Sequence, residues 1–209
     1  HPSPHRLKVF AQLEGKNLGI VLPDADLDVA AEQCMLGSTS YNGQRCTAIK
    51  LVMVHESIAD AFVQKLVAKI GALKAGLPWE DGVSITPLPE ANKPKYLEGL
   101  IADALDQGAS VANEALGGGQ LAGALMTPAI VDGVTPQMRL FHEEQFGPVV
   151  PVARFKDISE VTSAIKESWN GQQAAIFTSD AASAAPLVDT LSTIVGRVNL
   201  NLQCGRSPD

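Results

Sequence analysis

The sequence lacks a long apolar run, and this absence argues against one class of protein. No apolar stretch approaches the ~18 residues that a membrane-spanning helix needs. The first six residues are polar and show no signal-peptide pattern. We therefore expect neither a membrane protein nor a membrane partner.

Basic residues are also scarce. The chain has 16 Lys and Arg against 23 Asp and Glu, which gives a formal net charge of -7. General nucleic-acid binding needs a basic face, so we expect no nucleic-acid partner. The same average field repels anions, so an anionic substrate would have to be captured by local arginines.

Cysteine is limited to Cys34, Cys46 and Cys204. The count is odd and no pair has metal-ligand spacing, and the four histidines are scattered. We therefore predict no metal site. Free thiols fit a reducing compartment better than a disulfide framework does, so we expect a cytoplasmic protein.

Apolar residues, in contrast, make up 45% of the 209 residues, which is enough for a sizeable core. The chain starts without Met and stops at Asp209, soon after a strand-like run. We interpret it as a piece of a longer protein. The alternative of a natural short protein, cut by processing, stays open.

Apolar periodicity and Gly or Pro boundaries predict strands and helices that alternate along the whole chain. This alternation is typical of one three-layer α/β/α domain with a mostly parallel sheet. Strands are expected at residues 7–13, 18–22, 49–55, 84–88, 109–112, 127–131, 146–153, 174–178 and 196–202. Helices are expected at residues 27–37, 57–71 (with Ser57 as the cap), 93–107, 157–169 and 181–192.

Residues 117–122 fit a loose form of the dinucleotide-binding fingerprint. A true fingerprint follows a strand and opens a helix, whereas this stretch follows a helix-like segment and leads into a strand. We interpret it as a flexible loop.

Residues 41–48 place a thiol, Cys46, beside a guanidinium, Arg45, just after the glycine turn at Gly43. A thiol becomes a thiolate near neutral pH only in an electropositive, partly open setting, which Arg45 could supply. Cys46 is therefore a candidate nucleophile. The alternative is a small buried side chain that happens to follow an arginine.

Four pieces stand in order along the chain: Gln12-Leu-Glu-Gly-Lys16, Asn42-Gly-Gln-Arg-Cys46, Glu143-Glu-Gln-Phe-Gly-Pro-Val149 and Gly196-Arg-Val-Asn-Leu-Asn201. In this order and at these separations the chain resembles the catalytic domain of the aldehyde dehydrogenase superfamily. Because an arginine precedes the cysteine and Arg206-Ser-Pro-Asp209 stands near the end, it is most similar to the non-phosphorylating, NADP-dependent glyceraldehyde-3-phosphate dehydrogenases.

This resemblance implies that Cys46 attacks an aldehyde carbonyl, that hydride passes to a nicotinamide, and that water releases the acid from a thioester. Glu144 matches the carboxylate that holds the nicotinamide ribose of NADP or NAD. Phe146 matches the aromatic residue that packs near the nicotinamide. A solvated surface carboxylate is the alternative for Glu144, and ordinary core packing for Phe146.

The resemblance also assigns residues to the substrate, a small-molecule aldehyde. Arg45 and Arg206 match arginines that bind the phosphate of glyceraldehyde 3-phosphate, a role suited to guanidinium geometry. A structural salt bridge is the alternative for each. Asn201 lies near the substrate pocket by the same alignment.

The chain departs from the family at the general base. The family reads Glu-Leu-Gly-Gly-Lys where this chain reads Gln12-Leu-Glu-Gly-Lys16. An amide such as Gln12 cannot accept a proton at useful pH. Glu14 projects from the same face of an extended strand about 7 Å away and is our candidate replacement. The alternatives are slow deacylation and another residue.

The resemblance covers residues 1–209 as the catalytic domain and places the dinucleotide-binding domain and the subunit-bridging strand outside the chain. The chain alone is then expected to be inactive, and its parent to be a homo-oligomer, a dimer or tetramer. Two other classes of function stay open. One is a cysteine acyltransferase or hydrolase without a nicotinamide, and the other is a non-catalytic relic of the fold.

Overall fold

One large sheet forms the centre of the protein. The computed structural model describes residues 3, 5 and 13–205. Within these residues, seven strands run in the order β11-β10-β1-β2-β9-β8-β5. Every neighbouring pair is parallel except β5 and β8. The strands are β1 (Asn17–Val21), β2 (Ile49–His55), β5 (Ser110–Val111), β8 (Ala129–Asp132), β9 (Val149–Phe155), β10 (Gln173–Phe177) and β11 (Arg197–Leu200).

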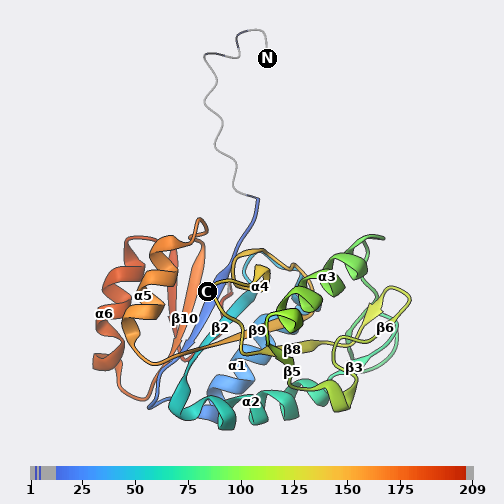
Figure 1. The fold of residues 1–209 in the computed structure, drawn as a ribbon, viewed down its shortest axis with the longest axis horizontal. Coiled ribbons are helices and arrows are strands. Elements are labelled where there is room, and N and C mark those ends of the chain that lie inside the picture. The colour runs from blue at the N-terminus through green and yellow to red at the C-terminus, as the bar shows by residue number, and fades with distance from the viewer. Residues whose placement is uncertain (1–2, 4, 6–12, 206–209) are drawn as a thin grey trace.

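Helices cover both faces of this sheet (Figure 1). Side chains of α1 (Leu27–Thr39) and α2 (Glu56–Gly71) pack in one buried cluster with one face of the strands. Those of α3 (Lys93–Asp106), α5 (Ile158–Glu167) and α6 (Ala181–Ser192) pack in a second cluster on the other face. The expected three-layer α/β/α fold with a mostly parallel sheet is confirmed.

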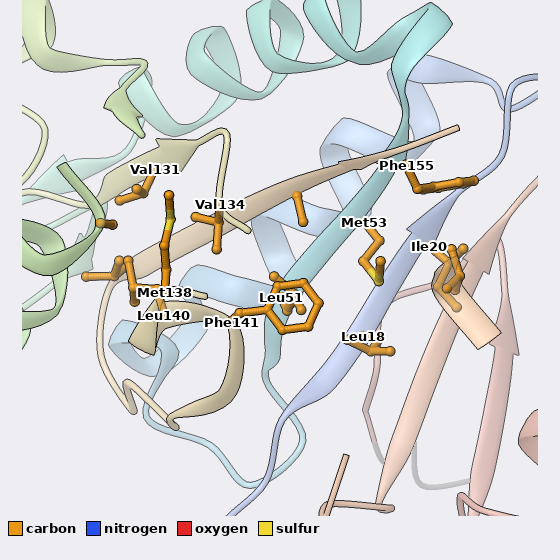
Figure 2. Close-up of a cluster of buried hydrophobic side chains, with 14 of the residues drawn as sticks. Leu18, Ile20, Leu51, Met53, Val131, Val134, Met138, Leu140, Phe141 and Phe155 are labelled. Atoms are coloured by element: carbon orange, nitrogen blue, oxygen red, sulfur yellow. The ribbon is translucent and has the colours of Figure 1, made fainter. Parts of the chain in front are cut away.

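Strand β2 shows why its sequence is almost continuously apolar. Leu51 and Met53 point into the cluster beneath α3, α5 and α6, where Figure 2 shows them with Phe141 and Phe155. Val52 and Val54 point to the opposite cluster, beneath α1 and α2. Because alternate residues face opposite layers and both layers are helical, every position from residue 49 to residue 54 is buried.

The helix starts agree with the sequence except at α2. Asp26 caps α1 by accepting from the backbone N–H groups of Asp28 and Val29, as expected from its acidic start. Ser57 was predicted to cap α2, but it lies inside the helix. The cap is His55, whose Nδ1 accepts from the Ser57 N–H at 3.3 Å. An imidazole nitrogen fills the role here because the ring is held against Phe155, at a centroid distance of 5.4 Å.

Several predicted strands are shorter than expected. The strand at 84–88 is only β4 (Val83–Ile85), which pairs with β3 (Lys74–Ala75) in a separate small sheet before Pro87 intervenes. The strand at 127–131 begins after Pro128, because proline has no N–H for the ladder. The strand at 196–202 ends at Leu200, since Asn201 turns the chain at a φ of 52°. The strand expected at 7–13 falls, up to residue 12, outside the described residues.

Residues 117–120 of the glycine-rich stretch form a loop, as predicted, whereas residues 121–122 already belong to a short strand. It follows a short 3₁₀ turn, η3 (Glu114–Leu116), and Gly117 and Gly119 take φ values of 80° and 82°. The chain then enters a small hairpin, β6 (Leu121–Ala122) with β7 (Leu125–Met126). No helix follows the glycines, so the fingerprint geometry is not formed.

Candidate active site

The candidate nucleophile lies at the amino edge of the sheet, where three distant segments meet. Cys46 precedes β2, Lys16 precedes β1, and Glu144 precedes β9. The N–H of Gly15 donates to Glu144 Oε1 at 3.1 Å, and Asn17 Nδ2 donates to the Cys46 carbonyl at 2.8 Å. These bonds join residues up to 129 positions apart in sequence.

The loop that carries Cys46 is pinned by an unusual backbone. After α1, the turn η2 (Ser40–Gly43) holds Tyr41, Asn42 and Gly43 at positive φ. A Cβ on Gly43 would lie 2.6 Å from the carbonyl oxygens of Gly147 and Ser38, so only glycine fits there. The Asn42 amide ties the turn to Thr86, accepting from its N–H at 2.9 Å and donating to its hydroxyl at 3.1 Å.

The thiol of Cys46 is exposed, while the other two thiols are buried. Burial raises the pKa of Cys204 to about 12. Burial raises the pKa of Cys34 still further, and the charge of Cys204 is a lesser cause of that rise. The alternative of Cys46 as a small buried side chain therefore does not hold. Both buried thiols pack in the cluster that contains the side chains of α1 and α2.

Glu144 is not a solvated surface carboxylate. Its side chain is 11% exposed and pairs at 2.7 Å with Lys50, which is 1% exposed. Its neighbour Glu143 is the more exposed of the two carboxylates. Glu143 accepts two bonds from Arg139, at 2.7 and 2.9 Å, and these bonds are the main cause that lowers its pKa.

A cavity of about 370 Å³ opens beside the Glu144 carboxylate. It is lined by Leu13, Glu14, Lys93, Tyr96, Glu144 and Phe146. Phe146 is half-buried at a φ of 43°, and the Lys93 Nζ lies 5.7 Å from its ring centroid. The structure thus brings Glu14, Glu144 and Phe146 together, and Phe146 is not ordinary core.

Two lining residues escaped the sequence analysis, Lys93 and Tyr96. They stand one helical turn apart at the start of α3, and that spacing was the only signal available. The Tyr96 hydroxyl donates to the carbonyl of Glu144 at 3.0 Å. Burial, reinforced by the charge of Glu143, raises the pKa of Tyr96 to about 12, so its hydroxyl stays protonated at neutral pH.

Lys16 forms a second buried cation at this edge. It donates to the Glu143 carbonyl at 2.6 Å and to Gln145 Oε1 at 2.8 Å. Burial, and then the nearby charge of Lys50, lower its pKa to about 7. The Gln145 Nε2 in turn donates to the Lys50 and Val149 carbonyls, each at 2.9 Å. This explains why a buried glutamine follows the two glutamates.

Arg45 has donors that the described residues leave unmet. Its Nη2 reaches only the Gly37 carbonyl and Gln203 Oε1, each at 3.4 Å, and its Nε is buried without a partner among the described atoms. These contacts are long and uncharged, so no salt bridge within residues 13–205 accounts for Arg45. A guanidinium in this state, next to Cys46, is suited to an anion.

The remaining predicted residues fall elsewhere. Gln12 and Arg206 lie outside the described residues. Asn201 is at the opposite, carboxyl edge, where its amide accepts from the Thr178 N–H at 3.0 Å and donates to the Thr178 carbonyl at 2.9 Å. Its substrate-binding role stays a prediction that this placement does not favour. Glu14 is exposed and lines a second cavity, of about 490 Å³, with Lys16 and Phe141.

The described residues contain neither a metal-binding cluster nor a helix that could span a membrane. No cluster of three or more His, Cys, Asp and Glu side chains could hold a metal ion in the part of the chain that the structure describes. Among the helices of that same part, none has the length and apolar character needed to cross a membrane.

Known proteins are similar to this chain in sequence. The chain is 42% identical over 198 residues to the NADP-dependent glyceraldehyde-3-phosphate dehydrogenase of Zea mays. The matched region covers 95% of this chain and 38% of that protein. A vanillin dehydrogenase of Pseudomonas is 36% identical over 93% of this chain and 40% of its own. The chain therefore spans about two fifths of the length of the curated relatives it matches.

Solved structures agree. An NADP-dependent glyceraldehyde-3-phosphate dehydrogenase of Bacillus halodurans, complexed with NADP, superposes with a TM-score of 0.88 at 43% identity, covering 94% of this chain and 40% of that one. A succinate-semialdehyde dehydrogenase of Burkholderia pseudomallei gives 0.90 at 32% identity, covering 98% and 42%. The model of the aldehyde dehydrogenase family matches residues 3–209. An exposed thiol on a pinned loop, this shared fold and this match lead to one conclusion: the chain belongs to the aldehyde dehydrogenase family.

Proposed function

We propose that the chain is the catalytic domain of an NADP-dependent aldehyde dehydrogenase whose substrate is glyceraldehyde 3-phosphate. The observation that carries this proposal is the exposed Cys46 thiol, on a loop bonded to the segment that holds Glu144 and next to an Arg45 with unmet donors. The relatives whose names specify this coenzyme and this aldehyde support it.

The chemistry centres on Cys46. Its thiolate adds to the aldehyde carbonyl carbon, and the carbonyl becomes the oxyanion of a thiohemiacetal. Loss of hydride from that carbon re-forms the carbonyl as a thioester. Water then adds to the thioester, the C–S bond breaks, and the acid leaves while the thiol is regenerated. The coenzyme, when bound, supplies the hydride acceptor.

The cavity of about 370 Å³ fits the nicotinamide half of such a coenzyme. The Glu144 carboxylate would accept hydrogen bonds from ribose hydroxyls, and Phe146 offers an aromatic face beside it. Both bonds that the described residues make to this carboxylate end on Oε1. The second oxygen would take the ribose. The rest of the dinucleotide would lie on a domain outside this chain.

Arg45 would bind the phosphate of the substrate. Its side chain is part-buried next to the nucleophile and, among the described residues, makes only long bonds to uncharged oxygens, so a phosphate would satisfy it without breaking one of the ion pairs described. Arg206 would be the second arginine. The expected result of Arg45→Met in the full-length enzyme is a large rise of KM for glyceraldehyde 3-phosphate and little change for an unphosphorylated aldehyde of similar size.

Glu14 would activate the water that hydrolyses the thioester, in place of the amide at Gln12. It lines the cavity beside Glu144 and has an exposed carboxylate. Single-turnover measurement of thioester hydrolysis tests this, with Glu14→Gln expected to slow the step and Gln12→Glu to accelerate it. Unchanged hydrolysis in Glu14→Gln would assign the base to another residue.

The decisive experiment uses the chain and its full-length parent side by side. We expect the parent to oxidise glyceraldehyde 3-phosphate with NADP faster than with NAD, and the 209-residue chain alone to show no turnover. A parent that transfers or hydrolyses acyl groups without needing a nicotinamide would overturn the dehydrogenase assignment. A Cys46 that iodoacetamide labels no faster than Cys34 and Cys204 at pH 7 would indicate a non-catalytic relic.

A further inference from the structure

Lys50 is buried at the junction between the nucleophile loop and the coenzyme cavity. Its side chain is 1% exposed. An ammonium has three N–H donors, and three acceptors surround this one. They are the Arg45 carbonyl at 2.9 Å, the Cys46 carbonyl at 3.3 Å and Glu144 Oε1 at 2.7 Å.

Two of these acceptors belong to the loop of the nucleophile. The Cys46 carbonyl also accepts from Asn17 Nδ2 at 2.8 Å, so two donors hold this peptide group against the sheet. With the carbonyl fixed inward, the exposed thiol is directed outward. The third acceptor, Glu144, lines the cavity of about 370 Å³. One cation therefore fixes both the loop and the carboxylate.

Stability alone is a poor explanation for such a residue. Burying an ammonium and a carboxylate costs several kcal/mol of desolvation, and well-packed apolar residues of similar volume are often as stable or more so. A buried ion pair at this place is better explained by what it orients.

We propose that Lys50 is a positioning residue that couples Glu144 to the Cys46 loop and fixes a positive charge beside the Cys46 peptide group. This inference deepens the proposed function and rests on it for the roles of Glu144 and Cys46. Lys50 touches neither aldehyde nor coenzyme, and it acts through the two residues that do.

Other charged groups face the same space and must be held constant in any test. Arg45 lies on the loop itself, and Lys16 approaches from the start of β1. Glu143 approaches from the segment before β9, and the buried thiol of Cys204 packs near both Arg45 and Lys50. Of these, Lys16 is the closest match to Lys50, since it is also a buried lysine but bonds to Glu143 and Gln145 rather than to the loop.

The test measures the rate of Cys46 alkylation by iodoacetamide against pH, in the 209-residue chain without coenzyme or aldehyde, with the modified peptide followed by mass spectrometry. Lys50→Met is expected to move the midpoint of the profile about one unit to higher pH, and to slow alkylation about tenfold at pH 7. Lys16→Met is the matched control and is expected to give a smaller movement, although it too removes a buried lysine.

A Lys50→Met profile that superposes on that of the unchanged chain would overturn the proposal and leave Lys50 a structural residue. If circular dichroism shows that Lys50→Met does not fold, Glu144→Gln gives the second test. It leaves the ammonium without its carboxylate, so the profile should move to lower pH, and an unmoved profile overturns the proposal. Neither readout needs dehydrogenase turnover, so a failure of this inference can be distinguished from a failure of the proposed function.

Discussion

At the carboxyl edge of the sheet, Asp24 and Asn201 direct their polar atoms to the backbone of the chain itself. Asp24 accepts from the N–H groups of Ser179 and Asp180 and from the Thr178 hydroxyl, and Asn201 bonds to both backbone groups of Thr178. At the amino edge, the network instead leaves an exposed thiol, an open cavity and a guanidinium nitrogen that has no partner among the described atoms.

The difference shows how a cluster of structural hydrogen bonds can be distinguished from a functional site. Both edges carry carboxylates, amides and hydroxyls, and ligands of open α/β sheets usually bind at the carboxyl ends of the strands. Here the polar atoms of Asp24 and Asn201 at the carboxyl edge bind the backbone, whereas at the amino edge the candidate nucleophile Cys46 is exposed and the Arg45 Nε has no partner among the described atoms. Unmet hydrogen-bonding capacity, not polarity, marks the candidate active site.

The largest expected effect comes from removing the nucleophile. Cys46→Ser in the full-length enzyme should reduce aldehyde oxidation on the order of 10⁴-fold, because a hydroxyl in this setting is far less nucleophilic than a thiolate. The thermal midpoint should stay nearly constant, since the side chain is exposed. Retained turnover would show that the amino edge is not the reaction centre.

The second largest effect is expected from the backbone of the loop that carries Cys46. Gly43→Ala should destabilise the chain by about 3–4 kcal/mol in urea unfolding, because the added Cβ combines a φ of 69° with carbonyl oxygens 2.6 Å away. Gly82→Ala is the matched control. Its φ is 74° but no heavy atom lies within 4 Å, so only the backbone strain of about 1 kcal/mol is expected. Equal losses would mean that the loop yields to the added atom.

The buried cation Lys16 predicts a dependence of stability on pH. Its pKa in the folded chain is about 7, below its value in the unfolded chain. Between these values the unfolded state binds more protons, so the free energy of unfolding should rise with pH. We expect roughly 2 kcal/mol more stability from this group at pH 9 than at pH 7. Lys16→Met should remove that rise, and a rise of the same size in the variant would assign it to another group.

The smallest expected effect tests the carboxyl edge. Thr178→Val removes a buried hydroxyl that donates to Asp24 Oδ2 at 2.7 Å. We expect a loss of about 1–2 kcal/mol of unfolding free energy and no change in the rate of Cys46 alkylation. A slower alkylation would mean that the two edges are coupled, and would weaken the comparison on which these predictions rest.

Much of the fold followed from the sequence. The alternation of apolar strands and amphipathic helices predicted the three-layer fold, and the helices expected from residues 27 and 93 start at these residues in the structure. The errors were at strand ends, where Pro128 and the turn at Asn201 stop pairing earlier than apolar character suggests. Apolar character reports burial, whereas pairing also needs a partner strand with free donors and acceptors.

Only part of the candidate site could be predicted from the sequence in the same way. Cys46 and Glu144 stand out because their neighbours along the chain form recognisable motifs. Lys50, Lys93 and Tyr96 have no such neighbours, and their importance depends on what lies against them. Lys50 sits in an apolar strand, where its sequence gave no reason to expect an ion pair with a residue 94 positions later.

The sequence by itself determined the layers, the class of fold and the candidate for the nucleophile, because these depend on periodicity and on local motifs. Only the tertiary structure decided which polar groups meet. Parallel strands joined by helical crossovers bring the starts of β1, β2 and β9 side by side, and the hydrogen bonds formed there depend on distances in space that no local pattern encodes.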